Sequence, residues 1–207
     1  MINNRQSIRL KNYDYSQSGW YFITICTENR ECLFGHIINH PVGVGRDRPV
    51  SMVLNECGKI VELIWQSLPK RFPIVLDKFQ IMPNHIHMII HLVGVSFMKP
   101  YSRLKPEITM AIAKSNRHMG LINQKMGLIN QTPTLGHIIR YFKSKCTFEI
   151  HKNGFNNNLF QRNYYEQIIR NEIQLNRIRQ YIKNNPNQWN KDVNNPSKYV
   201  PIANKNS

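Results

Sequence analysis

The chain has 207 residues, 41% of them hydrophobic, which suits one folded domain and excludes a fully disordered chain. Its formal net charge is +16, and the excess is uneven. Residues 1–90 carry 10 Lys and Arg against 7 Asp and Glu, whereas residues 91–207 carry 18 against 5. Such a surface suits a polyanion, and nucleic acid is the expected partner, although a generally basic protein without such a partner has the same composition.

Two features argue against a secreted or membrane protein. The first residues, MINNR, lack an apolar signal core, and the longest apolar run, 88–95, is interrupted by His91 and too short to cross a bilayer. The four cysteines form no C-x-x-C pair, so their spacing does not support a structural zinc domain. We therefore expect a cytoplasmic protein with free thiols and no membrane partner.

The first half of the chain predicts several strands and one helix. Residues 20–27 (WYFITICT) are rich in aromatic and β-branched side chains, which favours a central strand. Apolar residues recur on one helical face over 54–68, and Pro69 follows, so a helix is predicted there. Short strands at 74–76 and 79–82 then lead into a longer strand.

The second half predicts two further helices separated by a strand. One helix is expected over 134–151, with a threonine as its N-cap, and a strand over 159–165. Asn171 is the expected N-cap of the last helix, with Gln174 at the capping-box position. Pro186 ends that helix, because the residue before a proline resists helical geometry.

The first five elements follow the βαββαβ order of a ferredoxin-like sandwich. We therefore expect an α+β fold with a central antiparallel sheet, helices on one face, and the last helix added at the C-terminal end. Two stretches are interpreted as inserted loops: the Gly/Pro-rich residues 40–49, and about 115–133, which contain MGLINQ twice.

The motif PNHIHMII at 83–90 predicts a strand in which His85 and His87 point to the same face. The apolar residues that alternate with them then face the core. Two imidazoles on one rigid face can share a divalent metal ion, which could polarise a bound phosphate. The alternative is a pair of half-exposed strand histidines with no ligand.

The last helix carries Tyr181 and Asn185 four residues apart, and therefore on one face. Arg177, Arg179 and Lys183 flank the tyrosine, and a cationic setting favours the phenolate and attracts phosphate. The chemistry suggested is attack by the tyrosine oxygen on a phosphodiester, with the Asn185 amide as a further oxygen ligand for Mg²⁺ or Mn²⁺. Alternatively, Tyr181 closes the edge of the core and Asn185 merely ends the helix.

These motifs together resemble the HUH tyrosine transposases that act on single-stranded DNA, and most closely the REP-associated tyrosine transposases. The resemblance covers most of residues 5–190, which we take as one domain, and leaves 191–207 as an Asn-rich tail that is expected to be extended or poorly ordered. The matching segments are RLKNYDYS at 9–16, WYFITICT at 20–27, IMPNHIHMII at 81–90 and LFQRNYYEQIIRNEIQLNRIRQYIKNNP at 159–186.

The resemblance implies an RRM-like sandwich in which His85, His87 and Asn185 bind the metal ion and Tyr181 is the nucleophile. Family members cut single-stranded DNA near short hairpins, form a 5′-phosphotyrosine bond and leave a free 3′-OH that later rejoins strands. Some relatives act as monomers, whereas others form homodimers with the tyrosine helix in the partner's site. Both arrangements stay open for this chain.

Basic side chains are the expected phosphate contacts, and unpaired bases could stack on aromatic residues. The candidate DNA-binding residues are Lys114, Arg117, Arg140, Lys143, Lys145, Arg162, Arg170 and Arg177.

Three alternatives compete with this interpretation. Tyr164 or Tyr165 could replace Tyr181 as nucleophile, since one of the two faces the histidine strand. A domesticated protein could bind DNA hairpins without chemistry. A metal-dependent nuclease could use activated water, but such sites recruit carboxylates, and only Asp77 lies near His85 in the sequence.

Overall fold

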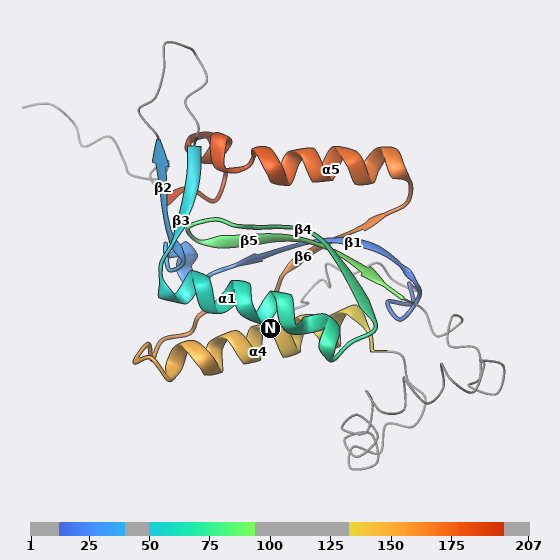
Figure 1. Cartoon of the computed structure of the whole chain (residues 1–207), viewed down its shortest axis with the longest axis horizontal. Coiled ribbons are helices and arrows are strands. Elements are labelled where there is room, and N and C mark those ends of the chain that lie inside the picture. Colours follow the sequence, from blue (N-terminus) through green and yellow to red (C-terminus); the bar gives the residue numbers. More distant parts are fainter. Residues whose placement is uncertain (1–12, 40–49, 94–132, 197–207) are drawn as a thin grey trace, which may run out of the picture.

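The computed structural model describes residues 13–39, 50–93 and 133–196. A four-stranded antiparallel sheet lies at its centre (Figure 1), with the strand order β4-β5-β1-β6. Since β5 lies between β1 and β4, the order fits the predicted βαββαβ plan, and the α+β class is confirmed. The strands are β1 (Gly19–Cys26), β4 (Ile74–Ile81), β5 (His85–Leu92) and β6 (Tyr165–Ile169).

Helices cover both faces of this sheet (Figure 1). The helices α1 (Glu56–Ser67) and α4 (Leu135–His151) pack on one face, and α5 (Glu172–Asn184) packs on the other. Two 3₁₀ helices, η1 (Glu28–Arg30) and η2 (Leu68–Lys70), follow β1 and α1. Within the described residues, no helix combines the length and the apolar character needed to cross a membrane.

Side-chain caps start the three long helices. The side chains of Asn55, Thr134 and Asn171 each accept a hydrogen bond from a backbone N–H three residues later. The predicted caps of α4 and α5 are therefore confirmed. Gln174 bonds to the backbone N–H of Arg170, one residue before the cap, rather than to the cap itself.

Alternation along β1 and β5 supplies two separate hydrophobic cores. The larger core lies between the sheet and the α1–α4 layer, and the smaller lies beneath α5. Because successive strand residues point to opposite faces, each strand contributes to both cores. On β1 and β5 the larger core contains Tyr21, Ile23, Ile25, Ile86, Met88 and Ile90, and the smaller core contains Phe22 and Ile89.

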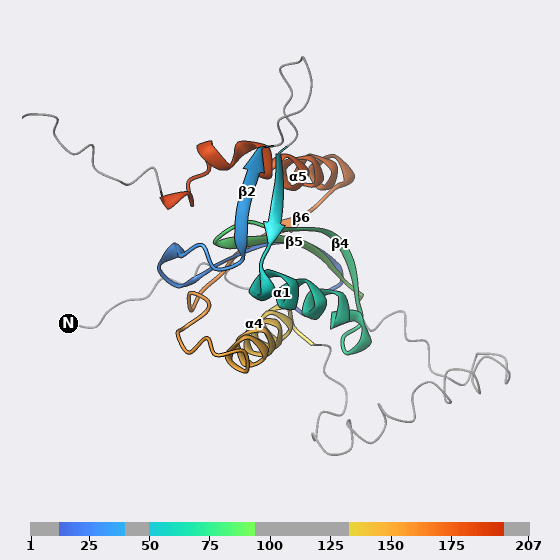
Figure 2. The same ribbon diagram turned by 60° about the vertical axis from the view of Figure 1, so that its left-hand side comes forward.

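A second sheet, which the sequence analysis missed, consists of the hairpin β2 (Gly35–Asn39) and β3 (Val50–Leu54). It stands across one end of the sandwich, from the level of α1 to the level of α5 (Figure 2), and β3 contacts the 3₁₀ helix η5 (Pro186–Lys191). Each strand has only five residues, so its alternation was too short to be noticed. Both predicted insertions fall almost wholly outside the described residues.

The predicted strand over 159–165 is wrong in its bounds, because β6 begins only at Tyr165. Leu159 and Phe160 are buried, but they anchor a loop to the larger core instead of extending a ladder. Phe160 makes a single isolated bridge with Thr27. The apolar residues of this segment indicate burial, and a buried residue can lie in a loop as well as in a strand.

The packing of α5 can be tested with two isoleucines of the same helix. Ile178 is 8% exposed in the smaller core, whereas Ile173 is 83% exposed. Ile178→Ala should lower the free energy of unfolding by about 2–5 kcal/mol, because it removes buried methyl groups and leaves a cavity. Ile173→Ala should change it by less than about 0.5 kcal/mol. Urea denaturation measures both, and equal effects would contradict the described packing.

Candidate active site

The two histidines of the predicted metal motif lie on the α5 side of β5. Both are buried, and their Nε2 atoms are 3.1 Å apart. His91 points the same way but lies at the other end of the strand, where its ring is 4.6 Å from that of Trp20. The strand therefore brings His85 and His87 together, as predicted, and separates His91 from them.

The side chain of Asn84 determines which nitrogen of His85 carries the proton. Asn84 Nδ2 donates to the backbone carbonyls of Arg30 and Asn194, at 2.8 and 2.7 Å, so its Oδ1 must be the atom that faces His85 Nδ1 at 2.9 Å. Since that oxygen only accepts, Nδ1 of His85 is the donor. Nε2 of the neutral ring then presents a lone pair to the site.

His87 is oriented by a hydroxyl on the neighbouring strand. Its Nδ1 lies 2.8 Å from Thr24 Oγ1, and the two residues are paired across β1 and β5. A hydroxyl both donates and accepts, so Thr24 serves either tautomer of His87. Nε2 of His87 can therefore donate to His85 or present a second lone pair beside it.

Burial keeps both rings neutral near pH 7. Burial lowers the pKa of His85 to about 3, with a contribution from the positive charge of Arg30. Burial also lowers the pKa of His87 to about 3, with help from His85 and opposition from Asp192. Neutral imidazole is the form that binds metal ions.

Asp192 joins this pair, and the sequence analysis did not anticipate it. Its Oδ2 lies 3.7 Å from His85 Nε2, and ligand atoms of His85, His87 and Asp192 all lie within 4.8 Å of one another. Asp192 follows η5 at the start of the predicted Asn-rich tail. The only signal in the sequence was a single carboxylate shortly after the tyrosine helix, and its importance depends on the turn that η5 makes.

The segment around Asp192 is held by several hydrogen bonds. Asp192 Oδ1 accepts from the backbone N–H of Asn194 at 2.7 Å, and Arg30 Nη1 donates to the carbonyl of Val193 at 2.9 Å. Asn84 holds the carbonyl of Asn194, as described above. The first residues of the predicted tail are thus part of the site, whereas the domain boundary at 190 stays a prediction.

Tyr181 and Asn185 approach the histidines from the C-terminal end of α5. The Tyr181 hydroxyl lies 3.5 Å from His87 Nε2, and its side chain is half exposed. Asn185 is buried, and its Oδ1 has no hydrogen-bond partner among the described residues. An orphaned buried oxygen is costly, so its position beside the site indicates a ligand that supplies the missing contact.

The expectation that cationic neighbours favour the Tyr181 phenolate is wrong for this structure. Burial and the negative charge of Asp192 raise the pKa of Tyr181, while a side-chain hydrogen bond with Asn185 opposes them. Arg179 does not act on the tyrosine, because its guanidinium forms an ion pair with Asp77 of β4. Tyr181 is therefore a neutral phenol at neutral pH.

The donor set fits a divalent cation. Two ligands that are each about 2.1 Å from one ion and at right angles to each other would be about 3.0 Å apart, and the two Nε2 atoms are 3.1 Å apart. The carboxylate of Asp192 lies within reach as an oxygen donor, and Asn185, whose Oδ1 has no partner among the described residues, stays the predicted further ligand. Mixed nitrogen and oxygen donors of this kind bind divalent metals.

The rival tyrosines are placed differently. Tyr165 pairs with Thr24 and lies on the histidine face, where its ring is 6.3 Å from that of Phe22. Tyr164 packs against the larger core. The contact between the Tyr181 hydroxyl and His87 supports Tyr181 as the nucleophile, although the assignment stays a prediction.

The candidate DNA-binding residues do not form one patch. Arg140, Lys143 and Lys145 lie on α4, across the sheet from the histidines. Lys143 donates to the carbonyls of Gln161 and Arg162, and Lys145 pairs with Glu149. Arg162, Arg170 and Arg177 are exposed, and the last two lie at or on α5; Lys114 and Arg117 are outside the described residues.

Comparison with known proteins places the chain in a family. It is 40% identical over 192 residues to an uncharacterized protein of Haemophilus influenzae (strain Rd), covering 92% of this chain and 93% of that protein. The chain belongs to the same family as that protein. No family model matches the sequence.

The fold also resembles two solved structures. One is a REP-associated tyrosine transposase bound to a REP hairpin, with a TM-score of 0.48 and 15% identity, covering 96% of this chain and 92% of the other. The second is a candidate transposase of Deinococcus radiodurans, with a TM-score of 0.35 and 15% identity, covering 85% and 95%.

Acid should destabilise the metal-free protein. The histidines have a pKa of about 3 when folded and about 6.5 when unfolded. Between these values the unfolded state binds more protons, so the free energy of unfolding falls as pH falls below 6.5. The slope should reach up to about 1.4 kcal/mol per pH unit for each histidine. Urea denaturation in EDTA at pH 7, 6 and 5 measures it, and a flat profile would contradict burial of the neutral rings.

Removal of the Asn84 amide should weaken metal binding. Asn84→Ala leaves His85 Nδ1 without its acceptor and releases the segment that carries Asp192, so the affinity for Mn²⁺ should fall about 10–100-fold. Titration followed by Mn²⁺ electron paramagnetic resonance measures this. Asn153→Ala, at an exposed site beyond α4, is the matched control and should bind normally. An unchanged affinity in a folded Asn84→Ala protein would show that the amide does not position the ligands.

Proposed function

We propose that this protein is a metal-dependent tyrosine transposase that cleaves and rejoins single-stranded DNA at hairpin-flanked sites. The observation that carries the proposal is the 3.5 Å contact between the Tyr181 hydroxyl and Nε2 of His87, beside the His85–His87–Asp192 cluster. A nucleophilic oxygen at the edge of a metal-ligating cluster is the arrangement that phosphodiester cleavage by tyrosine requires.

The metal ion would be held by His85, His87 and Asp192, with Asn185 as a further oxygen ligand. We propose Mg²⁺ or Mn²⁺, and expect Mn²⁺ to bind more tightly because imidazole is a poor ligand for magnesium. When bound, the ion supplies Lewis-acid polarisation of a phosphate oxygen.

The residues of the chain perform the remaining chemistry. Tyr181 enters as the phenol, since its pKa is raised. Its oxygen forms a bond to phosphorus while the bond from phosphorus to the 3′ oxygen breaks. The phenol loses one proton and the leaving 3′ oxygen gains one, so no net proton is consumed. The reverse attack by a 3′-OH rejoins the strands and restores the phenol, without a nucleoside triphosphate.

The proposed partner is single-stranded DNA that carries a hairpin. The net charge of +16 supports a polyanionic partner, and Arg170 and Arg177 provide exposed positive charge on the α5 side. Arg177 lies one turn before Tyr181, so it is on the same helix face as the nucleophile. Arg140, Lys143 and Lys145 would contact only DNA that extends around to α4.

We infer that the tyrosine acts in its own chain, in a monomer or in a homodimer that keeps the helix in place. The core beneath α5 is built from Leu175, Ile178 and Ile182 of the helix against the sheet. The ion pair between Arg179 and Asp77 adds a second attachment. These contacts support a complete site within one chain, and a homodimer that exchanged the tyrosine helix would have to break and remake them.

One observation favours a second candidate, a hydrolytic nuclease. Asp192 supplies the carboxylate that the sequence neighbourhood of His85 lacked, and such carboxylates also support activation of water. The tyrosine mechanism remains favoured because the Tyr181 hydroxyl occupies the edge of the cluster.

Covalent capture of DNA distinguishes the candidates. With Mn²⁺ and single-stranded hairpin oligonucleotides drawn from the DNA that flanks the gene, the wild-type protein should form a denaturation-resistant adduct carrying only the DNA downstream of the cut. Tyr181→Phe should abolish the adduct while changing the affinity for DNA less than about twofold, because it removes one hydroxyl that is not needed for binding. A denaturing gel with separate 5′ and 3′ labels measures this.

Tyr165→Phe is the matched control and should retain the adduct. Loss of the adduct in Tyr165→Phe but not in Tyr181→Phe would show that Tyr165 of β6 is the nucleophile. Cut DNA without an adduct would support the nuclease, and cleavage that persists in EDTA would exclude the metal-dependent mechanism.

A further inference from the structure

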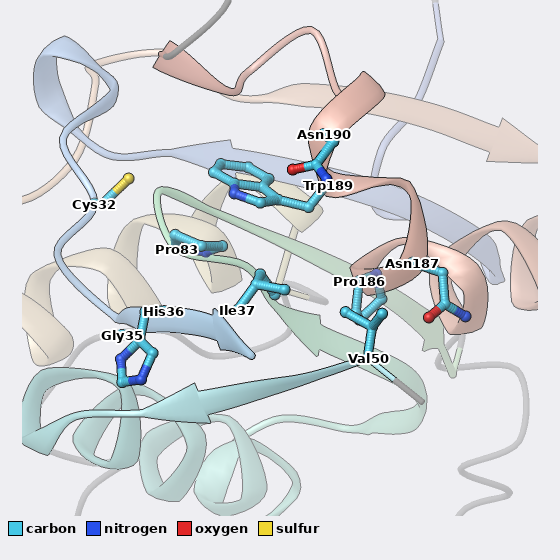
Figure 3. Close-up of a pocket in the computed structure, with 10 residues that line it drawn as sticks. All are labelled: Cys32, Gly35, His36, Ile37, Val50, Pro83, Pro186, Asn187, Trp189 and Asn190. Atoms are coloured by element: carbon cyan, nitrogen blue, oxygen red, sulfur yellow. The ribbon is translucent and has the colours of Figure 1, made fainter. Parts of the chain in front are cut away.

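A pocket of about 330 Å³ lies next to the proposed active site, between η5 and the β2–β3 hairpin (Figure 3). Trp189 and Asn190 come from η5 on one side, and Ile37 and Val50 come from the hairpin on the other (Figure 3). Its volume is at the lower end of the range for small-ligand pockets, roughly 300–1,000 Å³. This size suits one nucleotide and excludes a duplex.

The pocket shares residues with the framework of the metal cluster. Pro83 lines it two positions before His85, and Pro186 lines it directly after Asn185. The indole ring of Trp189 has its centroid 6.1 Å from that of His85. A group bound here therefore lies beside any phosphate that Tyr181 attacks.

The pocket has the chemistry of a site for an unpaired base. The half-buried indole of Trp189 offers a flat surface for stacking, and Ile37 and Val50 face it with aliphatic side chains. Asn190 is exposed at the pocket, and its amide can exchange hydrogen bonds with the edge of a base. The described residues that line it include no carboxylate, so they do not repel a phosphate backbone.

We propose that this pocket holds one unpaired base of the DNA strand next to the cleaved phosphodiester, with the base stacked on Trp189. The proposal rests on the proposed function for the identity of the strand. It assigns the β2–β3 hairpin a role, since that hairpin supplies the wall opposite the indole. It also gives the protein a contact that detects an unpaired base, which phosphate contacts by basic residues do not provide.

The test compares DNA with and without bases, in EDTA so that no cleavage is needed. The probes are fluorescein-labelled dA₁₂, dT₁₂ and a twelve-unit abasic strand, with binding measured by fluorescence anisotropy. The wild-type protein should bind dA₁₂ or dT₁₂ about tenfold or more tightly than the abasic strand. In Trp189→Ala the preference for strands with bases should fall about tenfold, with little change in the affinity for the abasic strand. Trp189→Phe should keep most of this preference.

Phe148→Ala is the matched control, because Phe148 is an exposed aromatic residue on α4, across the sheet. It should leave the preference for strands with bases unchanged. The proposal is overturned if the wild-type protein binds the abasic strand as tightly as dA₁₂ and dT₁₂. It is also overturned if a folded Trp189→Ala protein with normal Mn²⁺ affinity keeps the preference for strands with bases, or if this variant loses affinity for all three strands equally.

The two proposals fail separately. If the preference for strands with bases depends on Trp189 but the protein never forms a covalent adduct, the base pocket is supported and the transposase proposal fails. If the protein forms the adduct but its preference for strands with bases does not depend on Trp189, the transposase proposal is supported and the base pocket fails.

Discussion

The buried amide of Asn84 connects the chain segments on which the site depends. Its nitrogen donates to the carbonyls of Arg30, in η1, and Asn194, beyond η5, and its oxygen accepts from His85 at the start of β5. An amide has both donors and an acceptor, so one side chain satisfies two carbonyls and one imidazole at once. Arg30 itself has a positive φ of 56°, a conformation that is uncommon for residues other than glycine and that such contacts must stabilise.

The electrostatics of the site follow from burial. Two imidazoles with a pKa of about 3, a phenol with a raised pKa and a carboxylate lie together at the end of the sheet. Low dielectric disfavours every charged form, so the histidines and the tyrosine are neutral. The lone pair of His85 Nε2, the Asp192 carboxylate and the Asn185 oxygen, which has no hydrogen-bond partner among the described residues, form an electron-rich cluster. A cation is the kind of ligand that such a cluster favours.

The tyrosine helix owes its position to packing and to one ion pair. Leu175, Ile178 and Ile182 bury one stripe of α5 against β1, β5 and β6, and Arg179 reaches Asp77 on β4. The ion pair uses Arg179, two residues before Tyr181, whereas Arg177, one turn before the tyrosine, is exposed. Arg179 therefore helps to hold the helix on the sheet, while the guanidinium of Arg177 faces solvent.

The sequence by itself determined the parts of the molecule that depend on local periodicity. Alternation in PNHIHMII placed His85 and His87 on one face, helical spacing placed Tyr181 and Asn185 together, and Thr134 and Asn171 were recognisable as caps. Contacts between distant segments were decided only by the tertiary structure. The turn of η5 brings Asp192 to His85, which lies 107 positions earlier in the sequence. Asp77 of β4 forms an ion pair with Arg179 of α5. The five-residue strands β2 and β3 form the wall of a pocket because they pair with each other and contact η5, and no local pattern encodes such an encounter.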